Sequence, residues 1–182
     1  MIDDESDGSG ARNGHEDGWW TDLYDDTVAE VLMRRTPEES AAACDYLTRA
    51  LALSPGARVF DQGCGPGGLA VPLAQRGMRV FGVDLNGGYI ERARAAAEAA
   101  RVEATFLVGD ALSVVPPWPC DAALCWGTGF GNAARDEDNL RMLRQGHRAD
   151  ASAWLRFLGR LPAQVCSEHL QACAPALDGW EQ

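Results

Sequence analysis

Residues 59–68 read VFDQGCGPGG, in which two apolar residues and an acid lead to four glycines within six positions. The apolar residues predict the end of a short strand, and the residues after the glycines have helical spacing. Glycine is favoured where the backbone turns tightly or where another group approaches it closely. Between a strand and a helix, such a turn also exposes backbone N–H groups to a ligand at the positive end of the helix. The stretch predicts a ligand-binding turn in preference to a turn without a ligand.

Strand and helix patterns alternate after this turn. Strands are expected at residues 58–60, 79–83, 104–108 and 121–126, and helices at 69–76 and 89–101. This order is typical of a parallel sheet with crossover helices, whose carboxyl strand ends line one rim and collect ligands. The chain is therefore predicted to be an α/β protein with a Rossmann-like parallel sheet and flanking helices.

Two helices are expected before the glycine turn. Apolar residues recur at near-helical spacing over residues 19–35. The second helix has a clear start, because Thr36 as N-cap, Pro37 at the first helical position and Glu39 form a capping box. The sequence Ser54-Pro55-Gly56 is expected to end it.

Three acidic residues stand at the ends of successive strands. Asp84 lies about 20 residues beyond the turn, where a carboxylate accepts the hydroxyls of a ribose in NAD or in S-adenosylmethionine alike. Asp61 would repel a pyrophosphate but attract an ammonium group, and Asp110 is placed to accept from an adenine amine. Together the acids favour a ligand with a cationic end, a ribose and an adenine.

The run from Asp61 to Gly67 resembles the first motif of class I S-adenosylmethionine-dependent methyltransferases, and Asp84 and Asp110 fall on that family's ribose and adenine positions. The sequence CDAALCWGTGFGN, residues 120–132, is similar to the fourth strand and following loop of its small-molecule members. The resemblance covers roughly residues 18–143 and implies the strand order 3-2-1-4 with S-adenosylmethionine as cofactor.

The resemblance also implies which residues contact the cofactor. Asp61, Gly63 and Gly65 would hold its methionine end, and Tyr24 is the candidate from the N-terminal helix. The complete set of expected cofactor-binding residues is Tyr24, Asp61, Gly63, Cys64, Gly65, Gly67, Asp84, Leu85, Gly109, Asp110, Ala111, Cys125 and Trp126.

No catalytic residue or metal site is assigned from the sequence. Alignment of acceptor and methyl group supplies much of the rate in such a transfer, and none of the candidate bases His15, His147 and His169 is preferred. The six cysteines form no C-x-x-C pair and no cluster at zinc spacing, so no metal ligand set is expected.

Charge and composition exclude several partners. The net charge is −11, and residues 1–30 contain ten acids against Arg12 alone. Residues 1–17 are interpreted as a disordered acidic leader, residues 18–145 as the cofactor-binding domain and residues 146–182 as an atypical tail. Nucleic acid is disfavoured because basic residues do not cluster, and no segment suggests a membrane span or a secretory signal. The chain is therefore expected in the cytoplasm.

The tail departs from the family pattern. After Arg144 it lacks the expected Pro-Gly-Gly turn, and Val165 is the one β-branched residue among the last 37, so three strands of the family's sheet are expected to be absent. Two explanations stay open: one or two helices, or a shifted or truncated reading frame in a GC-rich gene, which is slightly preferred. Unless the tail or another chain covers it, the apolar fourth strand would be an open edge, so dimerisation or poor solubility is expected.

The leading functional hypothesis is methyl transfer from S-adenosylmethionine to a small molecule at oxygen, nitrogen or carbon. A base-methylating DNA enzyme is disfavoured because Pro116-Pro117-Trp118 precedes the fourth strand instead of following it. Trp126 and Phe130 are interpreted as walls of the acceptor pocket or, with equal weight, as core residues. The alternatives are a truncated, non-catalytic cofactor-binding remnant or subunit and, less favoured, an NAD-dependent oxidoreductase.

Overall fold

The computed structural model describes residues 24–31, 33–127, 129–130, 135–148 and 153–157. Its centre is a parallel sheet of strand order β3-β2-β1-β4-β5. The strands are β1 (Arg58–Gln62), β2 (Arg79–Asp84), β3 (Ala104–Val108), β4 (Ala122–Trp126) and β5 (Ala153–Phe157). The predicted order 3-2-1-4 is confirmed, and β5 extends it by one strand.

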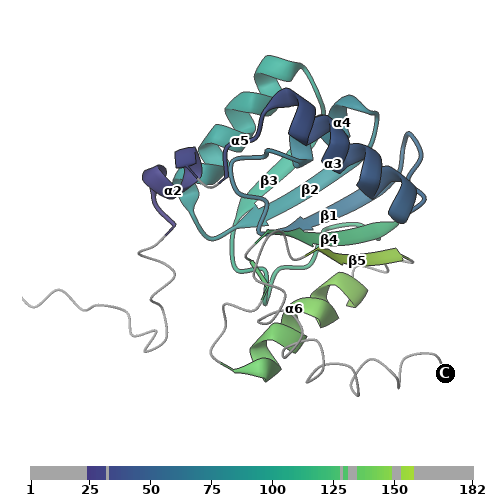
Figure 1. Ribbon diagram of the computed structural model, residues 1–182. Helices are drawn as coiled ribbons and strands as arrows, with labels where there is room; N and C mark the ends of the chain where they lie inside the picture. Colours follow the sequence, from purple (N-terminus) through teal and green to yellow (C-terminus); the bar gives the residue numbers. More distant parts are fainter. Residues whose placement is uncertain (1–23, 32, 128, 131–134, 149–152, 158–182) are drawn as a thin grey trace, which may run out of the picture.

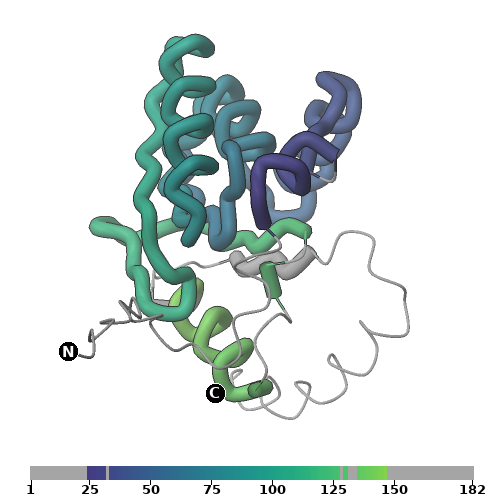
Figure 2. Tube along the Cα trace, turned by 90° about the vertical axis from the view of Figure 1, so that its left-hand side faces the viewer, coloured from purple at the N-terminus to yellow at the C-terminus, as the bar shows by residue number. Residues whose placement is uncertain are grey.

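Helices cover both faces of the sheet (Figure 1). One face carries α3 (Pro37–Ala50), α4 (Ala70–Gln75) and α5 (Gly87–Ala100). The opposite face carries α6 (Asp136–Arg148), which packs against β1 and β4. Figure 2, seen from the side, shows the same three layers. The expected flanking helices are therefore present within two residues of their predicted starts.

The start of α3 has the local chemistry that its sequence predicts. The Thr36 hydroxyl accepts from the Glu39 N–H at 3.2 Å, and the Glu39 carboxylate accepts from the Thr36 N–H at 3.0 Å. Pro37 occupies the first turn, where its missing N–H costs nothing. Of the helical region predicted over residues 19–35, the described part contains α2 (Asp26–Val31), while residues 19–23 and 32 lie outside the described residues.

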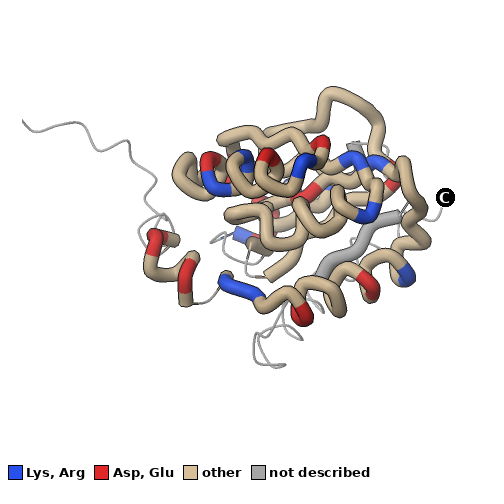
Figure 3. The backbone as a smooth tube through the Cα atoms, turned by 90° about the horizontal axis from the view of Figure 1, so that it is seen from above, with Lys and Arg blue, Asp and Glu red and all other residues tan. Residues whose placement is uncertain are grey.

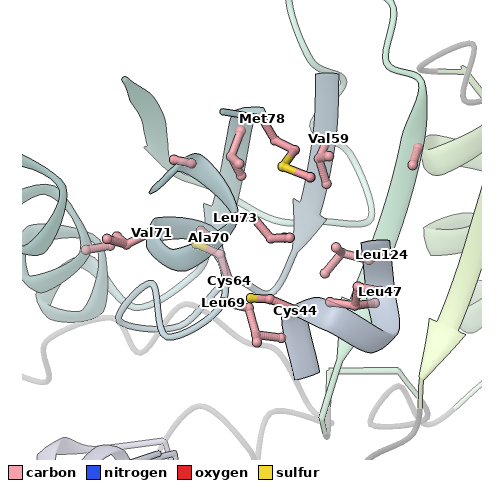
Figure 4. Packing of buried hydrophobic residues seen from close by; sticks show 14 of the residues in the cluster. Cys44, Leu47, Val59, Cys64, Leu69, Ala70, Val71, Leu73, Met78 and Leu124 are labelled. Carbon is pink, nitrogen blue, oxygen red and sulfur yellow. The ribbon is translucent and has the colours of Figure 1, made fainter. Parts of the chain in front are cut away.

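The main hydrophobic core lies between the sheet and the α3–α5 layer. Leu47 of α3, Leu73 of α4, Val59 of β1 and Leu124 of β4 are all at most 1% exposed. Figure 4 shows these side chains converging on one another. A smaller cluster around Phe60 fills the opposite face. Because β1 is buried on both faces, the glycine turn that follows it starts from a rigid strand.

The described part of the tail corrects the sequence interpretation. The segment Ala153–Phe157, expected to be helical, is a strand that pairs in parallel with β4, with Leu124 opposite Leu155. At least one of the strands thought to be absent is therefore present. An open edge at β4 was expected only if nothing covered this strand, and β5 of the tail covers it. This edge therefore gives no reason for dimerisation. The rest of the tail lies outside the described residues.

Candidate functional site

The glycine turn joins β1 to α4 at the carboxyl end of the sheet. Gly63, Gly65 and Gly67 have φ values of +73°, +53° and +85°, a region that side chains disfavour. The N–H groups of Gly63 and Cys64 both donate to the Val83 carbonyl, at 2.8 and 2.9 Å, which fixes the turn against β2. The main reason for glycine at these three positions is therefore the positive φ that the turn requires.

Gly67 has an additional packing reason. A Cβ at this position would lie 3.3 Å from the Ala93 Cα and 3.3 Å from the Val71 Cγ2. The missing side chain lets the turn approach α5. At Gly63, by contrast, the nearest atom to an added Cβ would be the Gly129 Cα at 4.0 Å, so space remains beside this residue.

Asp61 is a buried carboxylate beside this turn. Asp61 is only 2% exposed, and among the described residues no donor forms a hydrogen bond with its carboxylate. Burial, and after it the charge of the Asp84 carboxylate, raises the pKa of Asp61 to about 7 against the opposing effect of Arg35. A cation placed here would replace the lost hydration and favour the charged form.

Asp84 ends β2 and holds the loops around it. Its Oδ2 accepts from the Gly65 N–H at 2.8 Å, and its Oδ1 accepts from the Asn86 N–H at 2.9 Å. Burial raises the pKa of Asp84, while the hydrogen bonds from Asn86, Gly65 and Leu85 lower it. Each carboxylate oxygen has a second lone pair for an additional donor, so Asp84 can bind a ligand hydroxyl while it holds the turn.

The end of β3 places the third acid on the same rim. Asp84 and Val108 are register partners, so Gly109 and Asp110 follow directly beside β2. The Asp110 Oδ1 accepts from the Leu112 N–H at 2.8 Å, which shapes the loop that carries Ala111. Leu85 is 47% exposed beside this loop. The rim therefore offers a carboxylate next to apolar groups.

At the end of β4, two of the residues predicted to line the site are buried in the core and one lies at the rim. Cys125 is 1% exposed, and burial raises its pKa to about 12, so it is a core thiol. Phe130 is 2% exposed and packs with Cys125, Met142 and Leu143, which places it in the core instead of in a pocket wall. Trp126 is half-buried at the rim.

Cys64 is likewise a core residue. It is 8% exposed and belongs to the main cluster, and burial raises its pKa far above the usual range. A Cβ at Gly82 would lie 2.8 Å from the Cys64 Sγ, so β2 needs glycine at this position. A ligand can contact Cys64 through its backbone only.

The segment before α2 lies beside Asp84. The Tyr24 carbonyl accepts from the Asn86 Nδ2 at 2.7 Å, and the Asp25 carbonyl accepts from the Tyr89 hydroxyl. Asp26 forms an ion pair with Arg92 at 2.9 Å. These contacts bring Tyr24 to the start of α5, next to the residue expected to bind a ribose.

Two residues at this rim were missed in the sequence. A Cβ on Gly65 would lie 3.5 Å from the Met33 Sδ, and one on Gly68 would lie 4.0 Å from the Arg35 Cδ. The link between α2 and α3 therefore crosses the glycine turn. No local pattern marks these residues, because their place depends on the path of the link.

The described residues contain no group of three His, Cys, Asp or Glu side chains that could hold a metal ion. None of the described helices has both the length and the apolar character needed to cross a membrane. In the described residues, arginines and acids are spread over several helices, and α2 carries acids alone, as Figure 3 shows. The site is therefore a rim of carboxylates around a glycine turn.

A family model described as a methyltransferase domain matches residues 59–150. The chain is similar to a solved S-adenosyl-L-methionine-dependent methyltransferase from Thiobacillus denitrificans in complex with S-adenosyl-L-homocysteine. The identity is 30%, the TM-score 0.53, and the alignment covers 65% of this chain and 48% of that one.

Two curated relatives match shorter stretches. A protein-L-isoaspartate O-methyltransferase from Methylorubrum populi is 37% identical over 103 residues, 56% of this chain and 47% of its own. An S-adenosyl-L-methionine-dependent Diels-Alderase from Talaromyces variabilis is 46% identical over 52 residues, 29% of this chain and 18% of its own. The chain thus spans less than half the length of each of these relatives.

Proposed function

Because the chain belongs to the methyltransferase domain family, whose model covers residues 59–150, we propose that it binds S-adenosylmethionine at the glycine turn and transfers the methyl group to a small molecule. The cofactor is the one named for the similar structure from Thiobacillus denitrificans and for the Diels-Alderase. What we propose beyond family membership is that the methyl acceptor is a small molecule and that the whole protein catalyses the transfer.

The observation that carries the proposal is the state of Asp61. This carboxylate is almost completely buried, and no described hydrogen-bond donor contacts it. An unpaired buried carboxylate is costly unless a cation completes the site. The α-ammonium group of S-adenosylmethionine supplies that cation, whereas the pyrophosphate of NAD would add negative charge beside Asp61 and Asp84.

The neighbouring rim fits the rest of the cofactor. Asp84 has acceptor capacity left for the ribose hydroxyls, and Gly63 leaves space beside the turn. Asp110, Ala111 and the exposed Leu85 provide an acceptor and apolar contacts for an adenine. We assign Tyr24, Gly65, Gly67, Gly109 and Trp126 to the lining, and Cys64 by its backbone. Cys125 supports the rim from the core.

When bound, the cofactor supplies an electrophilic methyl group on a sulfonium, which an acceptor attacks in line. The residues of this chain orient the cofactor through Asp61 and Asp84 and exclude water at the glycine turn. Such alignment alone supplies about 7–11 kcal/mol of the barrier. No residue is assigned as a general base.

The choice of a small molecule rests on charge. The chain carries −11 overall, and its described arginines lie among acids on several helices (Figure 3). Binding to a nucleic-acid backbone depends on clustered positive charge. The relatives do not decide the acceptor, since one is named for a protein substrate and another for a Diels–Alder reaction. Free, buried cysteines among the described residues suit a reducing cytoplasm.

The first experiment is calorimetric titration of the purified chain with S-adenosylmethionine, S-adenosylhomocysteine and NADH in parallel. We expect binding of the first two, and an Asp84→Ala variant that loses it. Binding of NADH instead would overturn the cofactor assignment. The second step measures transfer of a radiolabelled methyl group to a panel of phenols, amines and carbon acids. Binding without any transfer would favour a non-catalytic cofactor-binding subunit.

A further inference from the structure

β3 lies at one edge of the sheet, and of the described strands only β2 pairs with it. Directly after β3, the Gly109 N–H donates to the Asp84 carbonyl of β2 at 2.9 Å. Successive residues of a strand direct their N–H and C=O groups to opposite edges, so this hydrogen bond fixes the direction of every such group along β3. The N–H and C=O groups of Ala104, Phe106 and Val108 therefore point away from β2, along what we call the outer edge of β3.

Arg94 of α5 already occupies the middle of the outer edge. Helix α5 packs against β3 (Figure 1), and the Arg94 Nη2 donates to the Phe106 carbonyl at 2.7 Å. Arg94 is exposed, and in the described part of the chain no carboxylate forms an ion pair with it. A strand that added to this edge would direct its own N–H at the Phe106 carbonyl. The guanidinium of Arg94 therefore takes the place of a partner strand.

Exposed apolar side chains lie beside the outer edge. Leu107 and Val108 are 42% and 48% exposed, although both are large and apolar. An edge strand with such side chains recruits a partner strand unless a charged side chain or another element covers it. Arg94 is a charged side chain that covers β3 at its middle residue, so the edge combines an attractive surface with a block.

A second copy of this chain fits the outer edge through two-fold symmetry. In an antiparallel pair centred on Phe106, each copy offers the same backbone groups to the other. This register brings Glu103 beside the uncharged Gly109 of the second copy, and Arg101 beside its Ala111. Around β3 no charged residue then lies opposite another charged residue, so repulsion does not oppose the pairing.

We propose that the outer edge of β3 is a binding surface for β3 of a second copy of this chain, and that Arg94 keeps this surface closed. When the Arg94 guanidinium leaves the Phe106 carbonyl, the sheets of two copies can join into one continuous sheet. The surface lies at the opposite edge of the sheet from β5. Arg94 and Phe106 are not among the residues assigned to the cofactor, so the failure of one proposal would leave the other unaffected.

The test compares the self-association of the parent chain with that of Arg94→Met by sedimentation equilibrium over a concentration series. Methionine keeps most of the apolar stem of Arg94 and removes its donors. We expect the dissociation constant of the dimer to fall roughly tenfold or more, the equivalent of freeing one hydrogen-bonding group at the edge. Arg94→Lys, which keeps one cationic donor on a narrower side chain, should fall between the parent and Arg94→Met.

Ala104→Pro, added to Arg94→Met, separates edge pairing from other causes of association. The Ala104 N–H points away from β2, so proline at this first residue of β3 removes a donor that a second copy needs and none that β2 needs. The double variant should return to the monomer. Arg92→Met is the matched control on the same helix, since Arg92 pairs with Asp26 instead of with β3. It should leave the dissociation constant unchanged.

Two results would overturn the proposal: Arg94→Met that associates no more than the parent, or a dimer that Ala104→Pro does not dissociate. A parent chain that already forms the full dimer would overturn the closing role of Arg94. Thermal melts check that each variant folds, and Arg94→Lys gives the same comparison if Arg94→Met does not fold.

Discussion

Asp61 makes the free energy of unfolding depend on pH in an unusual direction. Its pKa is about 7 in the folded chain, against 3.8 as the ordinary value. Between these pH values the folded chain holds a proton that the unfolded chain has lost, so the free energy of unfolding falls as the pH rises. The fall is complete above about pH 7 and amounts to at most about 4 kcal/mol.

Asp61→Asn should therefore stabilise the chain without ligand at pH 8 and have little effect at pH 4. Urea denaturation of both proteins at the two pH values measures the difference. The same change at Asp84 is the control, because Asp84 accepts from the Gly65 and Asn86 N–H groups and its replacement should destabilise the fold. A constant difference between Asp61→Asn and the parent across this range would contradict the raised pKa.

Gly67→Ala tests whether packing adds to backbone strain at the turn. Gly67 has φ +85°, and its added Cβ would lie 3.3 Å from the Ala93 Cα. Gly56 has a similar φ of +91° but nothing within 4 Å of an added Cβ. We expect Gly56→Ala to cost about 1 kcal/mol and Gly67→Ala about 2–4 kcal/mol by chemical denaturation. Equal losses would mean that the turn can move away from α5.

At the scale of elements, Asn86 connects the segment before α2 to α5. Its Oδ1 accepts from the Tyr89 N–H at 3.2 Å, which caps α5, and its Nδ2 donates to the Tyr24 carbonyl at 2.7 Å. Asn86→Asp keeps the cap but loses the donor and sets a carboxylate against a carbonyl. The variant separates these two functions.

We expect Asn86→Asp to speed hydrogen exchange at the amides of α2 about five- to tenfold, as for the loss of about 1 kcal/mol. The amides of α5 should keep their protection, since the cap remains. Tyr89→Phe, which removes the donor to the Asp25 carbonyl, should have the same effect. Loss of protection in α5 itself would show that the cap depends on the amide.

The β4–β5 pair is testable through the backbone. In a strand, the N–H groups of neighbouring residues point to opposite edges. Of Leu155 and Arg156, one therefore directs its N–H toward β4 and the other directs it away, so proline removes a hydrogen bond to β4 at only one of the two positions. We expect one of Leu155→Pro and Arg156→Pro to cost roughly 1–2 kcal/mol and to expose β4 amides to exchange, with the other as its control. If both variants keep β4 protected, β5 does not pair with it.

At the scale of the whole molecule, the sequence predicts elements whose signals are local. The Thr36 capping box, the bounds of β3 and the glycine turn depend on neighbouring residues, and the structure confirms them. β5 was missed because AWLRF has no β-branched residue and its pairing with β4 is decided across the sheet. Arg35 was missed for the same reason, since its position depends on how the link between helices crosses the rim.

The strand order also determines how long β1 waits for its second partner while the chain is being synthesised. One neighbour of β1 is β2, which begins about 20 residues later in the chain. The other neighbour is β4. The residue just before β4, Asp121, accepts from the Arg58 N–H of β1 and lies 63 residues further along the chain. At about 5–20 residues per second, a ribosome needs roughly 3–12 seconds to make the stretch between them. During that interval β1, a strand that the folded sheet buries on both faces, has one edge without a partner. We therefore expect chaperones to bind the nascent chain until β4 emerges.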